Sequence, residues 1–245
     1  MCPTDQPINP PVNPVGDPLP GWTMRPAPPR AAMQGRFCRV EPVEPSRHAG
    51  ELLAANQLDA GGRNWTYLPQ EPLLDFAAYR GWLEAVAAGD DPLFHAIVVM
   101  PGGRAVGVAA FMRIDRRNGV MEVGNINFSP LLQKRTAATE AMFLMMRRAF
   151  VELGYRRYEW KCDALNAASR RAALRLGFRF EGVFRQAVVY KGRNRDTAWF
   201  SIIDREWPAL AHAYEAWLAP ANFDSAGRQR SDLAAMITAA RGDGR

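Results

Sequence analysis

The loop at residues 132–139 carries the residue types that bind a phosphate group. It reads Leu-Gln-Lys-Arg-Thr-Ala-Ala-Thr and joins the end of an expected strand to the first turn of an expected helix. The first amides of a helix have no internal partner and carry the positive end of the helix dipole, so they attract anions. Thr136 can cap this helix or donate its hydroxyl, while Lys134 and Arg135 add positive charge. The same string also fits an ordinary capped helix with solvated cations.

A second segment strengthens the first interpretation. Asn-Ala-Ala-Ser-Arg-Arg at 166–171 follows the next expected strand, and Leu-Gly-Phe at 176–178 ends the helix after it. Residues 120–178 therefore run strand, basic loop, helix, strand, Asn-containing turn, helix. A strand-to-helix corner of this kind indicates a phosphorylated cofactor rather than metal or covalent-nucleophile chemistry.

Composition and cysteine usage narrow the class of protein. The 245 residues allow one large domain or two small ones, and 48% hydrophobic with 23% charged residues is ordinary for a globular protein. The net charge of +6 suggests an anionic partner or a spread of solvated arginines. The three cysteines and three histidines are scattered, so no metal site is expected and a reducing cytoplasm is favoured. No signal-peptide core is evident, and the longest apolar run, 105–112, is too short to span a membrane.

Hydrophobic periodicity predicts the elements that position these segments. Residues 1–35 hold ten prolines between positions 3 and 29 and are expected to form a flexible arm. Alternation predicts strands and helical spacing predicts helices. The expected strands are 37–41, 94–100, 105–114, 120–128, 158–163, 180–190 and 197–203, and the expected helices are 46–58, 72–86, 136–153, 167–176 and 207–218. The strands over 94–128 are expected to be antiparallel, and 219–245 to be a loosely held tail.

This arrangement resembles the GNAT superfamily of acyl-CoA-dependent N-acetyltransferases, and within it the RimJ/RimL-like branch. The resemblance covers about 36–207 and rests on the segments 133–138, 166–169, 176–178 and 195–197. It implies an α/β fold of the α+β kind over 36–218. In that fold a mixed, mostly antiparallel central sheet is flanked by helices and splays between its fourth and fifth strands, here 120–128 and 157–163.

The resemblance also implies where acyl-CoA binds. The coenzyme would sit in the gap of the splayed sheet, with its pyrophosphate on the 133–139 loop. The family pattern has Gly where this chain has Thr136, and Thr adopts positive φ only at a cost. The residues expected to contact the coenzyme are Asn127, Phe128, Gln133, Lys134, Arg135, Thr136, Ala137, Ala138, Thr139, Asn166, Ser169 and Arg170.

Two catalytic residues follow from the resemblance. Ser169 stands where the RimL-like branch places a hydroxyl near the cofactor sulfur, and the tyrosine that other members use is replaced by Ala173. We therefore expect Ser169 to be the general acid, although a serine near a helix start is often only a cap. Glu122 is either a general base or a structural carboxylate paired with Arg113 or another cation, and loss of the amine proton to bulk water, with no dedicated base, is a third alternative. A ping-pong mechanism on Cys162 is not expected, because alternation places that thiol with core residues.

The implied activity is transfer of acetyl from acetyl-CoA to a primary amine, on a protein N-terminus or a small molecule, by direct attack in a ternary complex. Backbone amides near Asn127 and Phe128 would stabilise the oxyanion. A catalytically silent acyl-CoA-binding regulator is the alternative, because the loop is altered and the tyrosine is missing. An RNA-binding module ranks last, since aromatic-basic interleaving is absent. Neither a membrane nor a metal is expected, and a monomer and a homodimer are equally compatible with the sequence.

Overall fold

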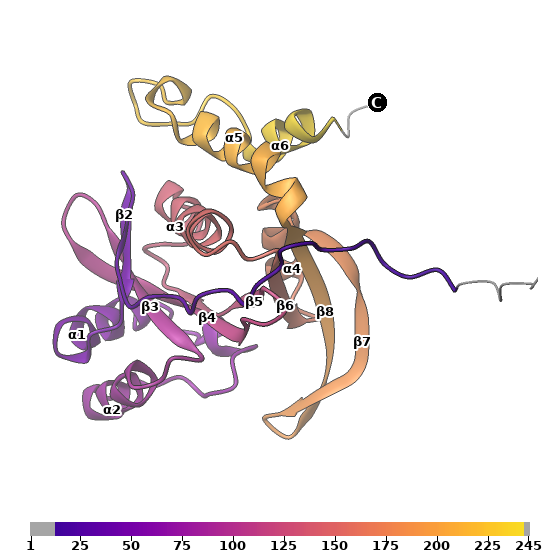
Figure 1. Ribbon diagram of the computed structural model, residues 1–245. Helices are drawn as coiled ribbons and strands as arrows, with labels where there is room; N and C mark the ends of the chain where they lie inside the picture. The colour runs from indigo at the N-terminus through magenta and orange to yellow at the C-terminus, as the bar shows by residue number, and fades with distance from the viewer. Residues whose placement is uncertain (1–12, 243–245) are drawn as a thin grey trace, which may run out of the picture.

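An eight-stranded mixed sheet forms the centre of the computed structural model, which describes residues 13–242 (Figure 1). Its strands are β1 (Met33–Gln34), β2 (Cys38–Pro42), β3 (Leu93–Val99), β4 (Arg104–Asp115), β5 (Val120–Phe128), β6 (Arg157–Asp163), β7 (Arg179–Tyr190) and β8 (Arg193–Ile203). They lie in the order β1-β2-β3-β4-β5-β6-β8-β7, and all neighbours are antiparallel except β5 and β6, which are parallel. The predicted fold class is confirmed.

Helices cover both faces of this sheet. They are α1 (Pro45–Asn56), α2 (Phe76–Ala87), α3 (Thr136–Arg147), α4 (Ala167–Arg175), α5 (Trp207–Leu218) and α6 (Leu233–Arg241), and shorter helical turns are η1 (Arg63–Trp65), η2 (Arg148–Glu152), η3 (Asp204–Glu206) and η4 (Pro220–Asn222). Figure 1 shows α1 and α2 on one side and α3 on the other. Within residues 13–242 no helix has the length and apolar character needed to cross a membrane.

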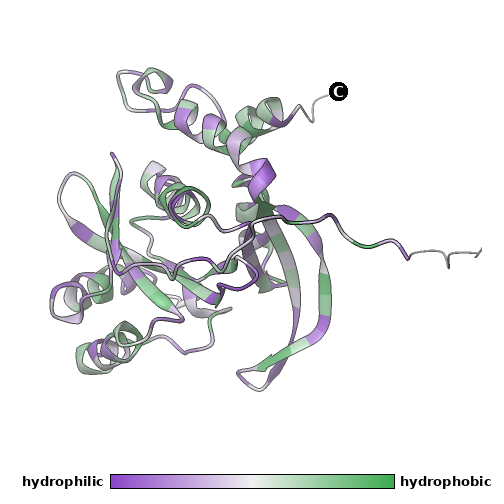
Figure 2. Cartoon of the chain, viewed as in Figure 1, coloured by the Kyte–Doolittle hydropathy of each residue, from purple (hydrophilic) through white to green (hydrophobic). Residues whose placement is uncertain are grey.

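Two hydrophobic cores lie on opposite faces of the strands. One joins α1 and α2 to β3 and β4, and includes Leu52, Leu83 and Phe94. The larger core joins α3, α5 and α6 to the opposite face of the sheet, β3 and β4 included, and contains Met142 and Leu210. Figure 2 shows mostly hydrophobic residues along the central strands and both classes of residue on the outer helices. Alternating side chains of one strand enter opposite cores because successive Cβ atoms point to opposite faces.

Most expected elements are confirmed within a few residues. The three antiparallel strands over 94–128 are β3, β4 and β5, and the strand-helix-strand unit that follows gives the parallel pair β5 and β6. The last hairpin is also present, but β8 begins at Arg193 because Lys191 and Gly192, both with positive φ, make a tight turn.

The N-terminal arm differs from the expectation in its described part, and residues 1–12 lie outside the described residues. Met33 and Gln34 form β1, and Met33 is buried. Further upstream, the Tyr155 hydroxyl donates to the carbonyl of Pro26 at 3.1 Å, and the Arg148 guanidinium donates to the carbonyl of Ala32 at 3.1 Å. Proline-rich backbone cannot pair with itself, so side chains from remote segments satisfy its carbonyls.

The interpretation of 219–245 as a loosely held tail also differs from the structure. Leu233 begins α6, whose N-cap Asp232 accepts from the amide of Ala235 at 3.1 Å. Leu233 and Ile237 are buried in the larger core against α5. A segment of nine residues is too short to form a stable helix by itself, so it depends on packing against α5. The sequence pattern of this segment alone therefore did not predict a helix.

Candidate active site

The sheet opens between β5 and β6. The two strands pair over only four residues each, from Val120 opposite Arg157 to Val123 opposite Trp160. At this point β5 also bulges against β4, and Asn125 in the bulge has a φ of 48°. A bulge inserts an unpaired residue and bends its strand, so β5 turns away from β6. The expected splay is therefore present.

The backbone of Phe128 faces the opening. The amide of Ser129 donates to the carbonyl of Val106 at 3.2 Å, so Phe128 occupies the alternate, non-hydrogen-bonded position of the β4–β5 ladder. Its amide and carbonyl therefore point away from β4, toward β6. Asn127 is opposite Val108 in this ladder, so its amide faces β4. Of the two expected oxyanion donors, the Phe128 amide alone has the required direction.

The carbonyl of Phe128 is held by two side chains. Gln133 Nε2 donates to it at 2.8 Å and Asn64 Nδ2 at 3.0 Å, and the two side chains also bond each other at 2.7 Å. The Gln133 side chain thus turns inward and fixes the strand end. Both donor bonds of this side-chain amide are therefore made within the protein, and its expected contact with the coenzyme stays a prediction. The sequence did not identify Asn64 as a site residue, because its two hydrogen-bond partners lie 64 and 69 positions away along the chain.

The loop before α3 presents free amide donors. The carbonyl of Ser129 accepts from the amides of Leu132 and Gln133 at 2.9 and 3.0 Å, which closes a tight turn. The amides of Thr136 and Ala137 open α3 and have no partner among residues 13–242. Together with the exposed cations before them, these amides form an anion-binding corner.

Thr136 takes the place of the family glycine without strain. The residue with positive φ in this loop is Lys134, at 58°, whereas Thr136 is already the first residue of α3. Arg135 precedes the helix in an extended conformation, and no side chain caps it. The expected capping role of Thr136 is therefore wrong, because its hydroxyl instead accepts from Gln229 Nε2 at 3.1 Å.

Two further residues of the expected coenzyme set contact protein groups. The hydroxyl of Thr139 accepts from Arg175 Nη1 at 3.1 Å, which ties α3 to α4. Arg170 Nη1 donates to the carbonyl of Ala164 at 3.2 Å, and its guanidinium lies 5.6 Å from the ring of Phe180. Both side chains are thus occupied within the chain in this structure.

Ser169 and Asn166 begin α4, directly after β6. The side chain of Asn166 is the N-cap, and its Oδ1 accepts from the amide of Ser169 at 3.0 Å. The hydroxyl of Ser169 accepts from Trp160 Nε1 at 2.9 Å. The cap is therefore Asn166, and the hydroxyl of Ser169, which accepts from Trp160, also lies within hydrogen-bonding reach of the Cys162 thiol. Cys162 is buried, and burial raises the pKa of its thiol, which fits the expected packing role.

Replacing Asn166 with Ala is expected to lower the free energy of unfolding by about 1 kcal/mol, because the amide of Ser169 loses its cap. Asn166→Asp keeps the acceptor and is the matched control. Thermal or urea unfolding of both variants measures the difference. Equal stabilities of the Ala and Asp variants would show that the cap contributes nothing.

Glu122 lies in a chain of buried charges on the face of β5 that also carries Gly124. Its Oε2 accepts from Arg113 Nη1 at 2.8 Å and from Lys161 Nζ at 3.0 Å. Lys161 Nζ also forms an ion pair with Glu159 Oε2 at 2.7 Å, and it lies 3.8 Å from the ring centre of Trp199. The expected pairing with Arg113 is present, and Lys161 is a partner that strand alternation alone did not identify.

Burial raises the pKa of Glu122 above its ordinary value, and the attraction of Lys161 and Arg113 opposes this rise without cancelling it. Both cations bind Oε2, and no hydrogen bond reaches Oε1 from residues 13–242. A Cβ built on Gly124 would lie 3.2 Å from Oε1, so this oxygen is directed toward the bulge. The carboxylate has both an anchored oxygen and an oxygen that can accept a proton.

Among residues 13–242, no group of three or more His, Cys, Asp or Glu side chains is placed to hold an ion. The free amides, the Phe128 amide and the Glu122 and Ser169 side chains are of the types that bind phosphate, stabilise an oxyanion and transfer protons.

Comparison with known proteins gives consistent matches. A family model described as "Acetyltransferase (GNAT) domain" matches residues 39–179. A solved structure of a GCN5-related N-acetyltransferase from Brucella melitensis is 51% identical, and the match covers 89% of this chain and 99% of that chain with a TM-score of 0.87. The SPbeta prophage-derived uncharacterized N-acetyltransferase YokL of Bacillus subtilis (strain 168) is 29% identical over 128 residues, which is 52% of this chain and 71% of that protein.

A more distant structure shares the fold. It is described as RimL, an alpha-N-protein acetyltransferase in complex with coenzyme A, and is 18% identical with a TM-score of 0.59. The match covers 71% of this chain and 98% of that chain.

Proposed function

The chain belongs to the GNAT acetyltransferase family, and from this premise we propose that it is an N-acetyltransferase that moves acetyl from acetyl-CoA to a primary amine. The acceptor is a protein N-terminus or a small-molecule amine. The observation that carries the proposal is the opening beyond Val123 and Trp160, with the Phe128 amide directed into it and free amides at the start of α3.

In the proposed complex, acetyl-CoA lies between the separated ends of β5 and β6. The amides of Thr136 and Ala137 bind the diphosphate, and the exposed side chains of Lys134 and Arg135 add charge. Because the positive φ falls on Lys134 rather than on Thr136, the missing glycine gives no reason to expect a silent protein. A structure with the same fold is described as a complex with coenzyme A, which supports coenzyme binding as part of the proposal.

The proposed reaction needs one proton removed and one proton supplied. The neutral amine attacks the thioester carbonyl, and a C–N bond forms while the C–S bond breaks. The Phe128 amide stabilises the oxyanion between these events. Oε1 of Glu122 accepts the proton that the amine loses, and the Ser169 hydroxyl donates to the departing thiolate. Glu122 then releases its proton to solvent, and solvent returns a proton to Ser169, so the net proton transfer runs from the amine to the thiolate of coenzyme A.

Calorimetry and a thiol-release assay test this proposal together. Coenzyme A should bind the full chain, and a Lys134→Ala/Arg135→Ala double variant should bind it less tightly, most clearly at low salt. Acetyl-CoA with a suitable amine should release free thiol. Coenzyme A binding with no release for any of a wide range of amines would favour the silent regulator, and no binding at all would refute the proposal.

Ser169→Ala is expected to lower kcat by about tenfold, below the usual range for general acids, because a thiolate leaves readily without full protonation. The variant also leaves Trp160 Nε1 without its acceptor, so a small loss of stability should accompany it. Ser169→Thr, which keeps a hydroxyl, should recover part of the rate. A rate equal to that of the unaltered chain would remove Ser169 from the mechanism.

We further propose a branch of the family and a cellular location for this protein. The serine at 169 and the coenzyme-bound RimL fold neighbour support a place in the RimJ/RimL-like branch. The two free, buried cysteines Cys38 and Cys162 support a reducing, cytoplasmic location.

A further inference from the structure

We propose that a cavity between α2 and the bulge of β5 receives the apolar substituent of the acceptor amine. Preferred acceptors are then amines that carry one neutral aromatic or branched aliphatic group, rather than polyamines, amino sugars or amino acids. The inference rests on the proposed acetylation of amines and adds the chemical class of the acceptor.

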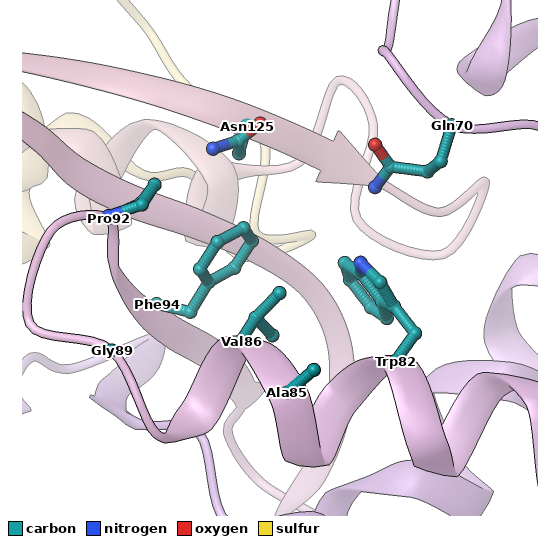
Figure 3. A pocket seen from close by; sticks show the side chains of 8 residues that line it. All are labelled: Gln70, Trp82, Ala85, Val86, Gly89, Pro92, Phe94 and Asn125. Carbon is teal, nitrogen blue, oxygen red and sulfur yellow. The ribbon is translucent and has the colours of Figure 1, made fainter.

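The cavity has a volume of about 290 Å³, at the lower end of the range for small-molecule sites. Figure 3 shows side chains from α2, β3, β5 and the loop before α2 converging on it. None of the lining residues is charged. They are Gln70, Trp82, Ala85, Val86, Gly89, Pro92, Phe94 and Asn125.

The apolar wall of the cavity is held by the core behind it. The ring of Trp82 meets Phe94 at 5.9 Å and Tyr79 at 5.3 Å, both edge-on, and Trp65 at 6.5 Å. Tyr79, Trp65 and Phe94 are buried, so Trp82 has little freedom to fill the cavity itself. A wall fixed in this way is formed before a ligand arrives, which favours an apolar group of matching size.

The cavity lies beside the proposed base. Asn125 lines the cavity and occupies the bulge, where its Nδ2 is 3.7 Å from the sulfur of Met112. A Cβ built on the adjacent Gly124 would lie 2.4 Å from that sulfur and 3.2 Å from Oε1 of Glu122. The cavity and the free oxygen of Glu122 are therefore neighbours along β5, with the sulfur of Met112 packed against both Gly124 and Asn125. In the proposal, an amine at Glu122 extends its substituent past Met112, an unbranched and adaptable side chain, into the cavity.

The groups around the cavity disfavour a second charged group on the acceptor. Glu122 already has two cationic partners, Arg113 and Lys161, and the polar side chains that line the cavity are all neutral: the amides of Gln70 and Asn125 and the indole of Trp82. A second ammonium or a carboxylate in the cavity would lose its water without gaining an ion partner. A hydrocarbon group gains from the same desolvation.

A panel of four amines tests the inference on the full chain. The panel contains 2-phenylethylamine and isopentylamine as apolar acceptors, and putrescine and β-alanine as charged ones of similar length. Thiol release from acetyl-CoA gives kcat/KM for each. We expect kcat/KM to be at least about tenfold higher for both apolar amines, which is the discrimination that a few buried methylene groups provide.

Filling the cavity provides the second test. Ala85 lines it from the exposed side of α2, so Ala85→Phe should occupy it with little effect on the core. The ratio of kcat/KM for 2-phenylethylamine to that for ethylamine should fall at least about tenfold. Ala77→Phe, at an exposed position of the same helix that does not line the cavity, should keep this ratio. Melting curves and coenzyme A titration verify that both variants are folded.

The outcomes separate the inference from the proposed function. Preference for the apolar amines with a selective loss in Ala85→Phe supports the inference. Acetylation of putrescine or β-alanine at equal or higher kcat/KM, or an unchanged ratio in Ala85→Phe, overturns it while amine acetylation stands. If no amine of the panel releases thiol, the inference is overturned as well, and the coenzyme A titration shows whether the proposed function falls with it.

Discussion

Replacing Glu122 with Gln is expected to lower kcat/KM for amine acetylation by about 100-fold or more, the usual contribution of a general base. Gln keeps the shape of the side chain, but it cannot accept the proton of the attacking amine. Arg113 and Lys161 would then face the neutral side-chain amide of the glutamine instead of a carboxylate. The fold should therefore persist with a moderate loss of stability. Initial rates of thiol release at fixed acetyl-CoA measure the effect.

The pH dependence of the reaction distinguishes a base from a structural carboxylate. Glu122 must be ionised to act as a base, so kcat/KM should fall as the pH falls through its pKa. Burial raises this pKa, and therefore the acidic limb should lie above the ordinary range of a glutamate. Glu122→Gln should remove that limb. Glu181→Gln, in the same charge network through Arg157, should retain it.

A loss of melting temperature in Glu122→Gln, with the acidic limb preserved, would identify a purely structural ion pair. Equal rate losses in Glu122→Gln and Glu181→Gln would instead point to the field of the whole charge network. Either result would leave proton removal to water and remove Glu122 from the mechanism.

Replacing Glu140 with Ala is expected to lower the free energy of unfolding by about 3 kcal/mol or more. This buried carboxylate of α3 accepts from three consecutive amides at the start of β2, those of Arg36, Phe37 and Cys38, at 2.8, 2.6 and 2.8 Å. Each amide would be left without a partner, at a cost of roughly 1–3 kcal/mol each where it stays buried. Urea unfolding with a fixed m-value measures the change.

An exposed glutamate provides the control for this loss. Glu84 on α2 is half-exposed and pairs with Arg80, so Glu84→Ala should change the free energy of unfolding by about 0.5 kcal/mol or less. The close approach of Gly35 gives an independent test, because a Cβ there would lie 2.4 Å from the Glu140 carboxylate. Gly35→Ala should therefore also destabilise the fold. If Glu140→Ala lowers the free energy of unfolding no more than Glu84→Ala does, the three amides must form hydrogen bonds with water in the variant.

Local spacing was enough to predict most of the fold. The alternation over 94–128 predicts β3, β4 and β5, and the helical spacing over 136–153 predicts the helix formed by α3 and η2, although α3 is buried on most sides rather than on one face. Both patterns depend on neighbours two to four positions apart, which a sequence displays directly. The same applies to the strand-to-helix corner before Thr136, because unpaired amides are inherent in any helix start.

Predictions about individual side chains succeeded less often, because each depends on a partner far along the chain. Gln133 turns inward to Phe128 and Asn64, and Thr136 meets Gln229. Both residues were predicted from the sequence to contact a ligand. The sequence does not show which distant protein groups bond the same side chains. The side-chain amide of Gln133 donates both bonds inside the protein, whereas Thr136 only accepts one, and only the packed structure shows which bonds form.

The sequence by itself determined the class of fold and the strand-to-helix corner before α3, and it named Glu122 and Ser169, the residues proposed to move protons. Tertiary structure alone decided that Lys161 joins Arg113 on one oxygen of Glu122 and that α6 docks on α5. It also created the cavity beside Asn125 from four separate segments. The physical reason is the distance along the chain between the interacting residues. Periodicity and helix ends depend on residues close in sequence, whereas pKa values, ion pairs and cavities depend on residues that become neighbours only in the folded structure.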